Sequence, residues 1–202
     1  MAFTPDKPFP KQAGDVIRSK DWTDAIEEVQ RLDTAKVNKV GDDITGPLNI
    51  AGRVLAENFA SGMELEPGDV VCMGPDEGTV VISGQRDDGL VMGVVSSEPG
   101  LLLNSALVDV VGGVPVFPIA LCGRVPCKVV AENGPIERGD LLASSSTSGH
   151  AMKATSVLQV QDPDDPSKQV ELHRAGTILG KAVGSLSELP GTGVIEVFVT
   201  AR

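Results

Sequence analysis

Apolar residues recur along this chain in two rhythms, one helical and one typical of strands. The helical rhythm covers residues 19–37, where apolar positions three and four apart fall on one helix face. Ser19 is a suitable N-cap for this helix. From about residue 60 onward, short apolar runs alternate with turn-forming pairs such as Asn133-Gly134, which is the pattern of strands joined by turns. The chain is therefore expected to be one helix followed by a β-rich region.

The predicted helix carries an apolar stripe made of Trp22, Ala25, Ile26, Val29 and Leu32, and its other face is mostly charged. A helix of about five turns is marginally stable alone, so the stripe should pack against a partner. That partner is either the rest of the chain or a copy of the same helix, and the residues leave both open. We expect Trp22 to be buried in either case.

The segments on either side of the helix differ from it in pattern. Residues 1–18 show no periodicity and contain several prolines, so we expect an extended arm there. Residues 39–54 are punctuated by glycines, and their apolar positions keep an even spacing that predicts short strands. Those positions are Ile44, Leu48, Ile50 and Val54.

The strand pattern of the remaining chain can be assigned run by run. Prolines interrupt several apolar runs, at Pro115, Pro118 and Pro126, which favours edge strands, bulges or interrupted ladders. The candidate strands are Val70–Cys72, Thr79–Ile82, Val91–Val95, Val108–Val111, Val114–Leu121, Val125–Val130, Leu141–Ala143, Ala151–Ala154, Gly176–Val183 and Val194–Thr200.

A short internal similarity links two parts of this region. Residues 66–72, EPGDVVC, match residues 137–143, ERGDLLA, and each is followed by a glycine-containing apolar stretch. The second copy contains an additional charged segment at about 159–174, which we expect to be a projecting hairpin or loop. The similarity indicates two related halves in one β module, and chance similarity between Gly-Asp turns is the alternative.

Charge and composition narrow the possible partners. The net charge is −11, which repels nucleic-acid phosphates and anionic membranes, so we expect no nucleic-acid partner. No apolar run is long enough to span a membrane, and the first residues lack the apolar core of a signal peptide. The three cysteines, Cys72, Cys122 and Cys127, do not suggest a disulfide framework and are expected to be small apolar fillers.

Side chains suited to catalysis or metal binding are sparse. A Ser–His–Asp set could be drawn from Ser144–Ser148, His150 and an aspartate, but no nucleophile-elbow sequence supports it. We read this segment, and the other histidine, His173, as surface loops. Acidic clusters could hold Ca²⁺ weakly, but they lack EF-hand spacing and fit solvated turns better. We therefore expect no enzyme, no cofactor and no metal; the acidic clusters are Asp42-Asp43, Asp87-Asp88 and Asp162–Asp165.

Two stretches of the sequence resemble known protein families. The first is KPFPKQAGDVIRSKDWTDAIEEVQRLDTAKVNKVGDDITGPLNI. It resembles the N-terminal part of phage tail-fibre-like proteins, in which a short helix precedes a Gly-Asp-x-x-Thr-Gly-Pro-Leu element, here Gly41–Leu48. The second runs from GVVSSEPGLLLN through ENGPIERGDLLASS to GTGVIEVFVTAR. It resembles a β domain at the end of tail-fibre and neck-appendage proteins, also found in bacterial proteins of uncertain role.

The resemblance implies an elongated fibre, spike or cap component of a phage tail or of a phage-derived contractile injection system. Such proteins are usually homotrimers. Some neck-appendage relatives carry a C-terminal chaperone segment that cleaves itself off, but this chain stops at Arg202, directly after an apparent strand. Self-cleavage is thus the least favoured function, and no catalytic residue is carried over.

These observations combine into one expectation. The protein is mainly β, with an N-terminal arm, amphipathic helix and attachment segment over 1–58 and a compact Gly/Pro-rich barrel or sandwich-like module over 59–202. We expect a trimer, with other tail, baseplate or cap proteins as partners, in a virion or in an extracellular or cytoplasmic tail-like particle. A receptor- or glycan-binding tip is the alternative. The residues expected to mediate oligomerisation and attachment are Trp22, Ile26, Val29, Leu32, Ile44 and Leu48.

Overall fold

The computed structural model describes residues 19–35, 50–105, 107, 110–111, 113–165, 167–188 and 191–200, and within the helix it describes the side chains of residues 22–30. The chain falls into two compact units, Met1–Asn49 and Ile50–Arg202. The boundary expected between residues 58 and 59 instead falls inside a strand, because residues 54–60 pair with the centre of the β unit.

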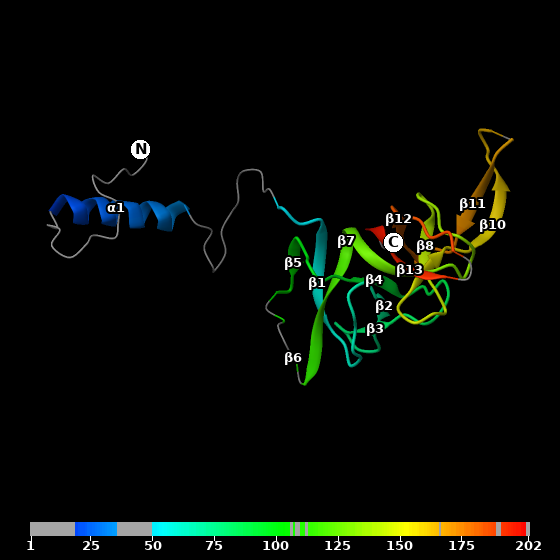
Figure 1. The fold of residues 1–202 in the computed structure, drawn as a ribbon, viewed down its shortest axis with the longest axis horizontal. Helices are drawn as coiled ribbons and strands as arrows, with labels where there is room; N and C mark the ends of the chain where they lie inside the picture. Colours follow the sequence, from blue (N-terminus) through cyan, green and yellow to red (C-terminus); the bar gives the residue numbers. More distant parts are fainter. Residues whose placement is uncertain are drawn as a thin grey trace. The chain divides into compact units, whose positions relative to one another are not determined.

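The described part of the first unit is the helix α1, Ser19–Ala35 (Figure 1). The predicted helix had the same first residue and extended to residue 37. Its apolar and charged positions divide between two faces as the spacing indicated. The arm and the Gly41–Leu48 element lie outside the described residues.

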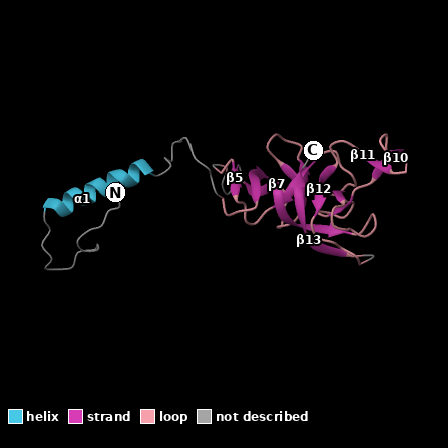
Figure 2. Cartoon of the chain, turned by 90° about the horizontal axis from the view of Figure 1, so that it is seen from above, coloured by secondary structure: helices cyan, strands magenta, loops and turns pink. Residues whose placement is uncertain are grey.

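The second unit is built from strands, as predicted. Thirteen strands are present in the part of the chain that the structure describes (Figure 2). They are β1 Val54–Ala60, β2 Val70–Met73, β3 Val80–Ile82, β4 Val91–Val95, β5 Leu101–Leu103, β6 Val110–Val111, β7 Val114–Val130, β8 Leu141–Ser144, β9 Ala151–Lys153, β10 Ser156–Gln161, β11 Gln169–His173, β12 Ile178–Ala182 and β13 Thr192–Thr200.

Five of these strands close into a β-barrel. Around the ring, β7 pairs with β13, β13 with β12, β12 with β8, β8 with β9, and β9 returns to β7. The β7–β9 pair is parallel and the other four are antiparallel. Closure leaves no unpaired edge within the ring. It also brings β7 and β13, which are far apart in the sequence, into one core.

The long strand β7 is the axis of the β unit. It has 17 residues; its first part pairs with β1, β4 and β6, and its second part with β9 and β13. The two pairings meet at Gly123, which is opposite Val54 in β1 and Val199 in β13. A side chain at this glycine would overlap the carbonyl oxygen of Arg53, so the close approach of β1 requires glycine here.

The prolines of β7 do not break it into two strands or confine it to an edge, as their positions had suggested. In an antiparallel pair, alternate residues direct their N–H groups away from the neighbouring strand. Lys128 directs its N–H to the Gly68 carbonyl at 2.9 Å, and Pro126, two residues earlier, faces the same way. Its missing N–H therefore costs no hydrogen bond to β13.

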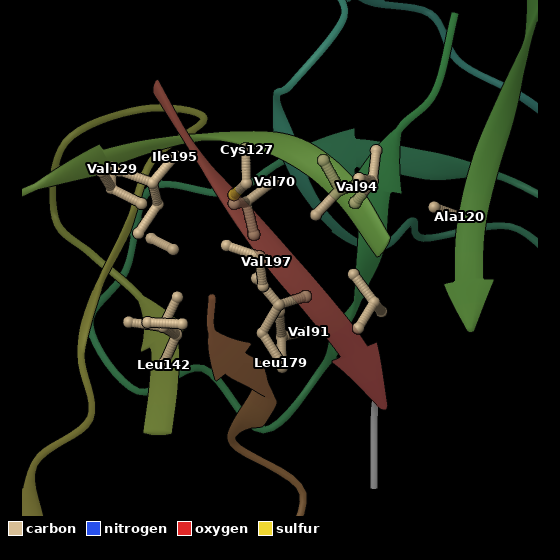
Figure 3. Close-up of a cluster of buried hydrophobic side chains, with 14 of the residues drawn as sticks. Val70, Val91, Val94, Ala120, Cys127, Val129, Leu142, Leu179, Ile195 and Val197 are labelled. Carbon is tan, nitrogen blue, oxygen red and sulfur yellow. The ribbon is translucent and has the colours of Figure 1, made fainter. Parts of the chain in front are cut away.

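The barrel interior is filled by aliphatic side chains from every strand of the ring (Figure 3). Leu142, Leu179, Val129 and Val197 are fully buried at its centre. A second cluster lies beside it, where β2, β3 and β4 pack near the first part of β7. Its buried members are Leu65, Val71, Val80, Met92, Val95 and Ile119.

The two similar sequence segments form the same turn in the structure. The Glu66 N–H donates to Asp69 Oδ2 at 2.8 Å, and the Glu137 N–H donates to Asp140 Oδ2 at 2.8 Å. The glycine before each aspartate has a positive φ, +89° in the first and +97° in the second. Each aspartate thus holds a Glu-x-Gly-Asp turn closed at the start of a strand.

The contacts beyond the two turns also match. The glycine N–H of each turn donates to a carbonyl in a later strand, Val95 in β4 or Ala182 in β12, at 2.9 and 2.8 Å. In return, the Val95 N–H donates to the Asp69 carbonyl and the Ala182 N–H donates to the Asp140 carbonyl, both at 2.9 Å. β2 with β4 and β8 with β12 are therefore equivalent antiparallel pairs, each preceded by the same turn.

Candidate functional site

The described helix α1 carries an exposed apolar stripe. Trp22 is 63% exposed, Ile26 54% and Val29 65%. The expected burial of Trp22 is thus not seen within the helix itself. Of the other residues expected to mediate attachment, the Leu32 side chain and both Ile44 and Leu48 lie outside the described residues. An exposed tryptophan beside two exposed aliphatic residues is a surface whose burial would release water and favour association.

The serine-rich segment near His150 does not form a catalytic set among the described residues. Ser144 Oγ accepts the Asp88 N–H at 2.9 Å, and Ser145 Oγ donates to the carbonyls of Thr147 and His150 at 3.0 and 2.9 Å. The His150 ring meets the backbone oxygen of Ser148 through Nδ1 at 2.7 Å. The Ser145 hydroxyl closes a turn and the Ser144 hydroxyl joins two distant segments, so the described partners of both are backbone groups and not a histidine ring.

The acidic clusters that the structure describes accept backbone hydrogen bonds, some within their own turn and one, at Asp87, from a distant residue. Asp87 Oδ1 accepts the Thr155 N–H and Asp88 Oδ1 accepts the Leu90 N–H. Asp165 accepts from the Ser167 N–H and hydroxyl and pairs with Lys168 at 3.0 Å. Within the described residues, no group of three acidic, histidine or cysteine side chains is placed to hold a metal ion. The pair Asp42-Asp43 lies outside them.

The three cysteines are free and differ in environment. Cys72 and Cys127 are buried in the core, whereas Cys122 is exposed on β7. Burial, aided by the nearby Asp69 carboxylate, raises the pKa of the Cys127 thiol to about 12. Burial likewise raises the pKa of the Cys72 thiol to about 12. Both are neutral, unreactive fillers near pH 7, as their apolar sequence setting indicated.

An ion pair between Lys128 and a buried aspartate joins the first Glu-x-Gly-Asp turn to β7. Lys128 Nζ lies 2.8 Å from Asp69 Oδ1 and 2.7 Å from Glu66 Oε2. The Asp69 side chain is 5% exposed and that of Lys128 23%. The hydrogen bond to Asp69, followed by that to Glu66, raises the pKa of Lys128, and the Lys128 hydrogen bond lowers the pKa of Glu66. This arrangement fixes the turn and gives no sign of an acid–base pair for catalysis.

Two surface hollows, each of about 560 Å³, lie on the β unit. The first has mixed charge, because it is lined by Arg53, Arg124, Glu98 and Glu196. Arg124 Nε lies 3.3 Å from Glu196 Oε2, so part of its positive charge is already compensated. This hollow therefore carries little net preference for an anion or a cation.

The second hollow lies on the outside of the barrel, beside the base of the β10–β11 hairpin. Its charged lining is basic, Arg174 and Lys181, together with His173, and no acidic residue lines it. The rest of its wall is apolar or small; these residues are Leu141, Ala175, Gly176, Ile178, Phe198 and Thr200. An uncompensated basic hollow is unusual in a chain of net charge −11 and makes it the stronger candidate binding site.

The hairpin β10–β11 projects from the β unit and pairs with no other described strand (Figures 1 and 2). Leu158 is opposite Leu172 and Val160 is opposite Val170, so one face of the ribbon is aliphatic. Leu158 is 55% exposed and Leu172 43%. The segment expected at 159–174 to be a projecting hairpin or loop is thus a hairpin. Its exposed apolar residues were not predicted, because the charges at its tip dominate the sequence pattern.

Sequence reasoning did not find the basic hollow. Its lining residues come from β8, β11, β12 and β13 and from the turn after β11. Arg174 and Lys181 each resemble an ordinary surface cation in the sequence. Their convergence depends on the pairing of β12 with both β8 and β13, which no local pattern specifies.

Comparisons with known proteins gave no match: no protein-family model, no curated protein and no solved structure is significantly similar to this chain. Among the described residues, no helix combines the length and the apolar character that crossing a membrane requires.

Proposed function

We propose that this chain is a non-enzymatic structural component of a phage-tail-like particle, such as a tail fibre, spike or cap protein. The observation that carries the proposal is the exposed stripe Trp22, Ile26 and Val29 on α1, in a unit separate from the β-barrel. A helix of this length gains stability mainly by burying such a stripe, and copies of the same chain are the simplest partner that can bury it.

The described chemistry of the β unit supports the same proposal. The serine hydroxyls and acidic side chains that were weighed for chemistry make hydrogen bonds to backbone groups, within turns or between distant segments. The buried thiols are held neutral. A closed barrel with a filled interior is suited to being a rigid module carried by a larger assembly.

Two measurements test the proposal. Sedimentation equilibrium of the full chain should give a mass near three times 21.0 kDa. In the organism that encodes the chain, purified tail-like particles should contain it, and an Ile26→Asp variant should be missing from them. A monomer over a wide concentration range, or a chain that stays in the slowly sedimenting fraction, would contradict the proposal.

A receptor- or glycan-binding tip is the second candidate. The projecting β10–β11 hairpin favours it, because its face with Leu158 and Leu172 is exposed and projecting loops commonly carry recognition. Replacing both residues with serine should abolish capture of a host-surface component while leaving particle incorporation intact. Equal capture by the variant would rule out the hairpin as the recognition element.

A further inference from the structure

Beyond the proposed particle role, we infer that the basic hollow beside β12 binds an oxyanion, a carboxylate or phosphate group, attached to an apolar body. The hollow is open to solvent on the outside of the barrel and has a volume of about 560 Å³. That size suits a small organic anion or one acidic side chain with its neighbours.

The floor of the hollow is a row of three side chains from adjacent strands. Lys181 in β12 is directly opposite Leu141 in β8 on one side and Phe198 in β13 on the other. Directly opposed side chains in a sheet have Cβ atoms about 5 Å apart. The aliphatic stem of Lys181 therefore lies between a leucine and a phenylalanine that is 44% exposed, with its ammonium group directed to solvent. The row offers an apolar surface with one cation at its centre.

The wall of the hollow supplies the second cation. Arg174 lies in a turn fixed by Thr177, whose hydroxyl donates to the Arg174 carbonyl at 2.8 Å. The preceding residue, His173, is held by a contact between its Nδ1 and the Thr155 carbonyl at 3.1 Å. Since a carbonyl oxygen only accepts, Nδ1 donates in this contact, which fixes the ring beside the hollow. The fixed backbone limits the entropy lost when these side chains bind an anion.

The positive charge of this hollow is uncompensated within the described residues. Arg174 and Lys181 have no ion-pair partner there, whereas other described cations, such as Arg86, Arg124 and Lys128, are paired. Asp140, next to Leu141 in the sequence, is already engaged by Lys153 at 3.0 Å. An arginine guanidinium binds carboxylate or phosphate in a bidentate manner, and the exposed ring of Phe198 can stack on an aromatic group.

The experiment is a nuclear magnetic resonance titration of the full chain with four probes. 3-Phenylpropionate and phenyl phosphate carry both the anion and the apolar body. 3-Phenylpropanamide keeps the body without the charge, and inorganic phosphate keeps the charge without the body. We expect the first two to shift the amide signals of Lys181 and Phe198 with a dissociation constant on the order of 1 mM. Each of the other two lacks either the charged group or the apolar body and should bind at least about tenfold more weakly.

Variants that remove the same charge at different places distinguish binding at this hollow from non-specific electrostatic attraction of the anion to the protein. The double variant Arg174→Gln with Lys181→Gln should raise the dissociation constant of the tighter-binding anionic probe by about tenfold or more. The control is Arg53→Gln with Arg138→Gln, which removes the same charge from two described arginines outside this hollow and should leave binding unchanged. Whether the carboxylate or the phosphate probe binds tighter identifies the natural anion. Equal binding of the neutral amide, shifts elsewhere on the barrel, or equal loss in the control would overturn the inference.

Discussion

Lys128 Nζ lies 2.8 Å from Asp69 Oδ1, and this contact joins the central strand β7 to the turn that begins β2. The Asp69 side chain is 5% exposed and also holds the Glu66 N–H. The second Glu-x-Gly-Asp turn has a similar contact, in which Lys153 Nζ lies 3.0 Å from Asp140 Oδ2. The two differ in burial, since Asp140 is 19% and Lys153 38% exposed, and in that Lys128 also contacts Glu66 Oε2 at 2.7 Å. The two contacts can be compared by experiment.

Removing Lys128, which faces the buried Asp69, should destabilise the protein more than removing Lys153, whose pair is more exposed. Lys128→Met leaves a buried aspartate without its counter-charge and should lower the free energy of unfolding by about 2–4 kcal/mol. Lys153→Met removes a more solvated pair and should cost about 1 kcal/mol or less. Urea denaturation of the three proteins measures both differences. Equal losses would show that burial of Asp69 does not strengthen its pairing with Lys128.

The contribution of the same ion pair to the free energy of unfolding should depend on pH in a predictable direction. The pKa of Lys128 is raised in the folded protein from its ordinary value of 10.5. Its contribution is therefore complete below about pH 10.5 and is lost as pH rises through the folded-state pKa. The difference in unfolding free energy between the wild type and Lys128→Met should be constant near pH 7–9 and shrink above pH 10.5. A difference that grew at high pH would contradict this.

The three cysteines should react at different rates. Cys122 is exposed, whereas burial raises the pKa of Cys72 and Cys127 to about 12. The thiolate is the reacting species, so Ellman's reagent at pH 8 should modify one thiol rapidly and the other two only after denaturant is added. The Cys122→Ser variant should lose the fast phase. Two fast thiols in the wild type would show that one of the core positions opens readily.

Two glycines in equivalent strands should be intolerant of any side chain. A Cβ at Gly93 would overlap the carbonyl oxygen of Ala120, and a Cβ at Gly180 would overlap that of Phe198. Either substitution to alanine should cost about 2 kcal/mol or more, because backbone cannot move aside as a flexible side chain can. Gly62→Ala is the control, since nothing lies within 4 Å of its added Cβ. Thermal unfolding compares the three, and a neutral Gly180→Ala would refute the expected overlap.

The exposed helix stripe should determine the oligomeric state. Trp22→Ala removes the largest apolar side chain of the stripe, and truncating an aromatic that is buried in an assembly costs about 3–5 kcal/mol. Sedimentation velocity should then show dissociation at concentrations where the wild type stays assembled. Glu27→Gln, on the exposed charged face, should have no such effect. An unchanged oligomer in the Trp22→Ala protein would exclude the stripe as the interface.

Local patterns predicted much of the strand content but missed β1, which contains polar residues, and the short β5, which is all leucine. β4 was predicted with its observed bounds, Val91–Val95, because all five residues are apolar and buried. β1 was missed because Glu57 and Asn58 interrupt its apolar pattern. Asn58 is nevertheless buried, and its amide donates to the Leu107 carbonyl at 2.8 Å. A buried polar residue with a distant partner leaves no signal in its own neighbourhood.

Closure of the barrel and the basic hollow could not be predicted because both depend on long-range register. The pairing of β13 with β7 places Ile195 opposite Cys127, residues far apart in the sequence. The row of Leu141, Lys181 and Phe198 depends on two such pairings at once. Periodicity indicates which face of a strand is apolar, but it does not specify which strand lies next to it.

The meeting of β1 and β13 at Gly123 has a practical consequence for protein engineering. Val54 and Val199 flank this glycine from opposite sides, and neighbouring strands are about 4.8 Å apart. The first and last strands of the β unit therefore lie roughly 10 Å apart at this level, two strand spacings. A reporter fused after Thr200 would emerge near the start of β1, and the β unit could be grafted into a host loop with closely spaced ends without a long spacer.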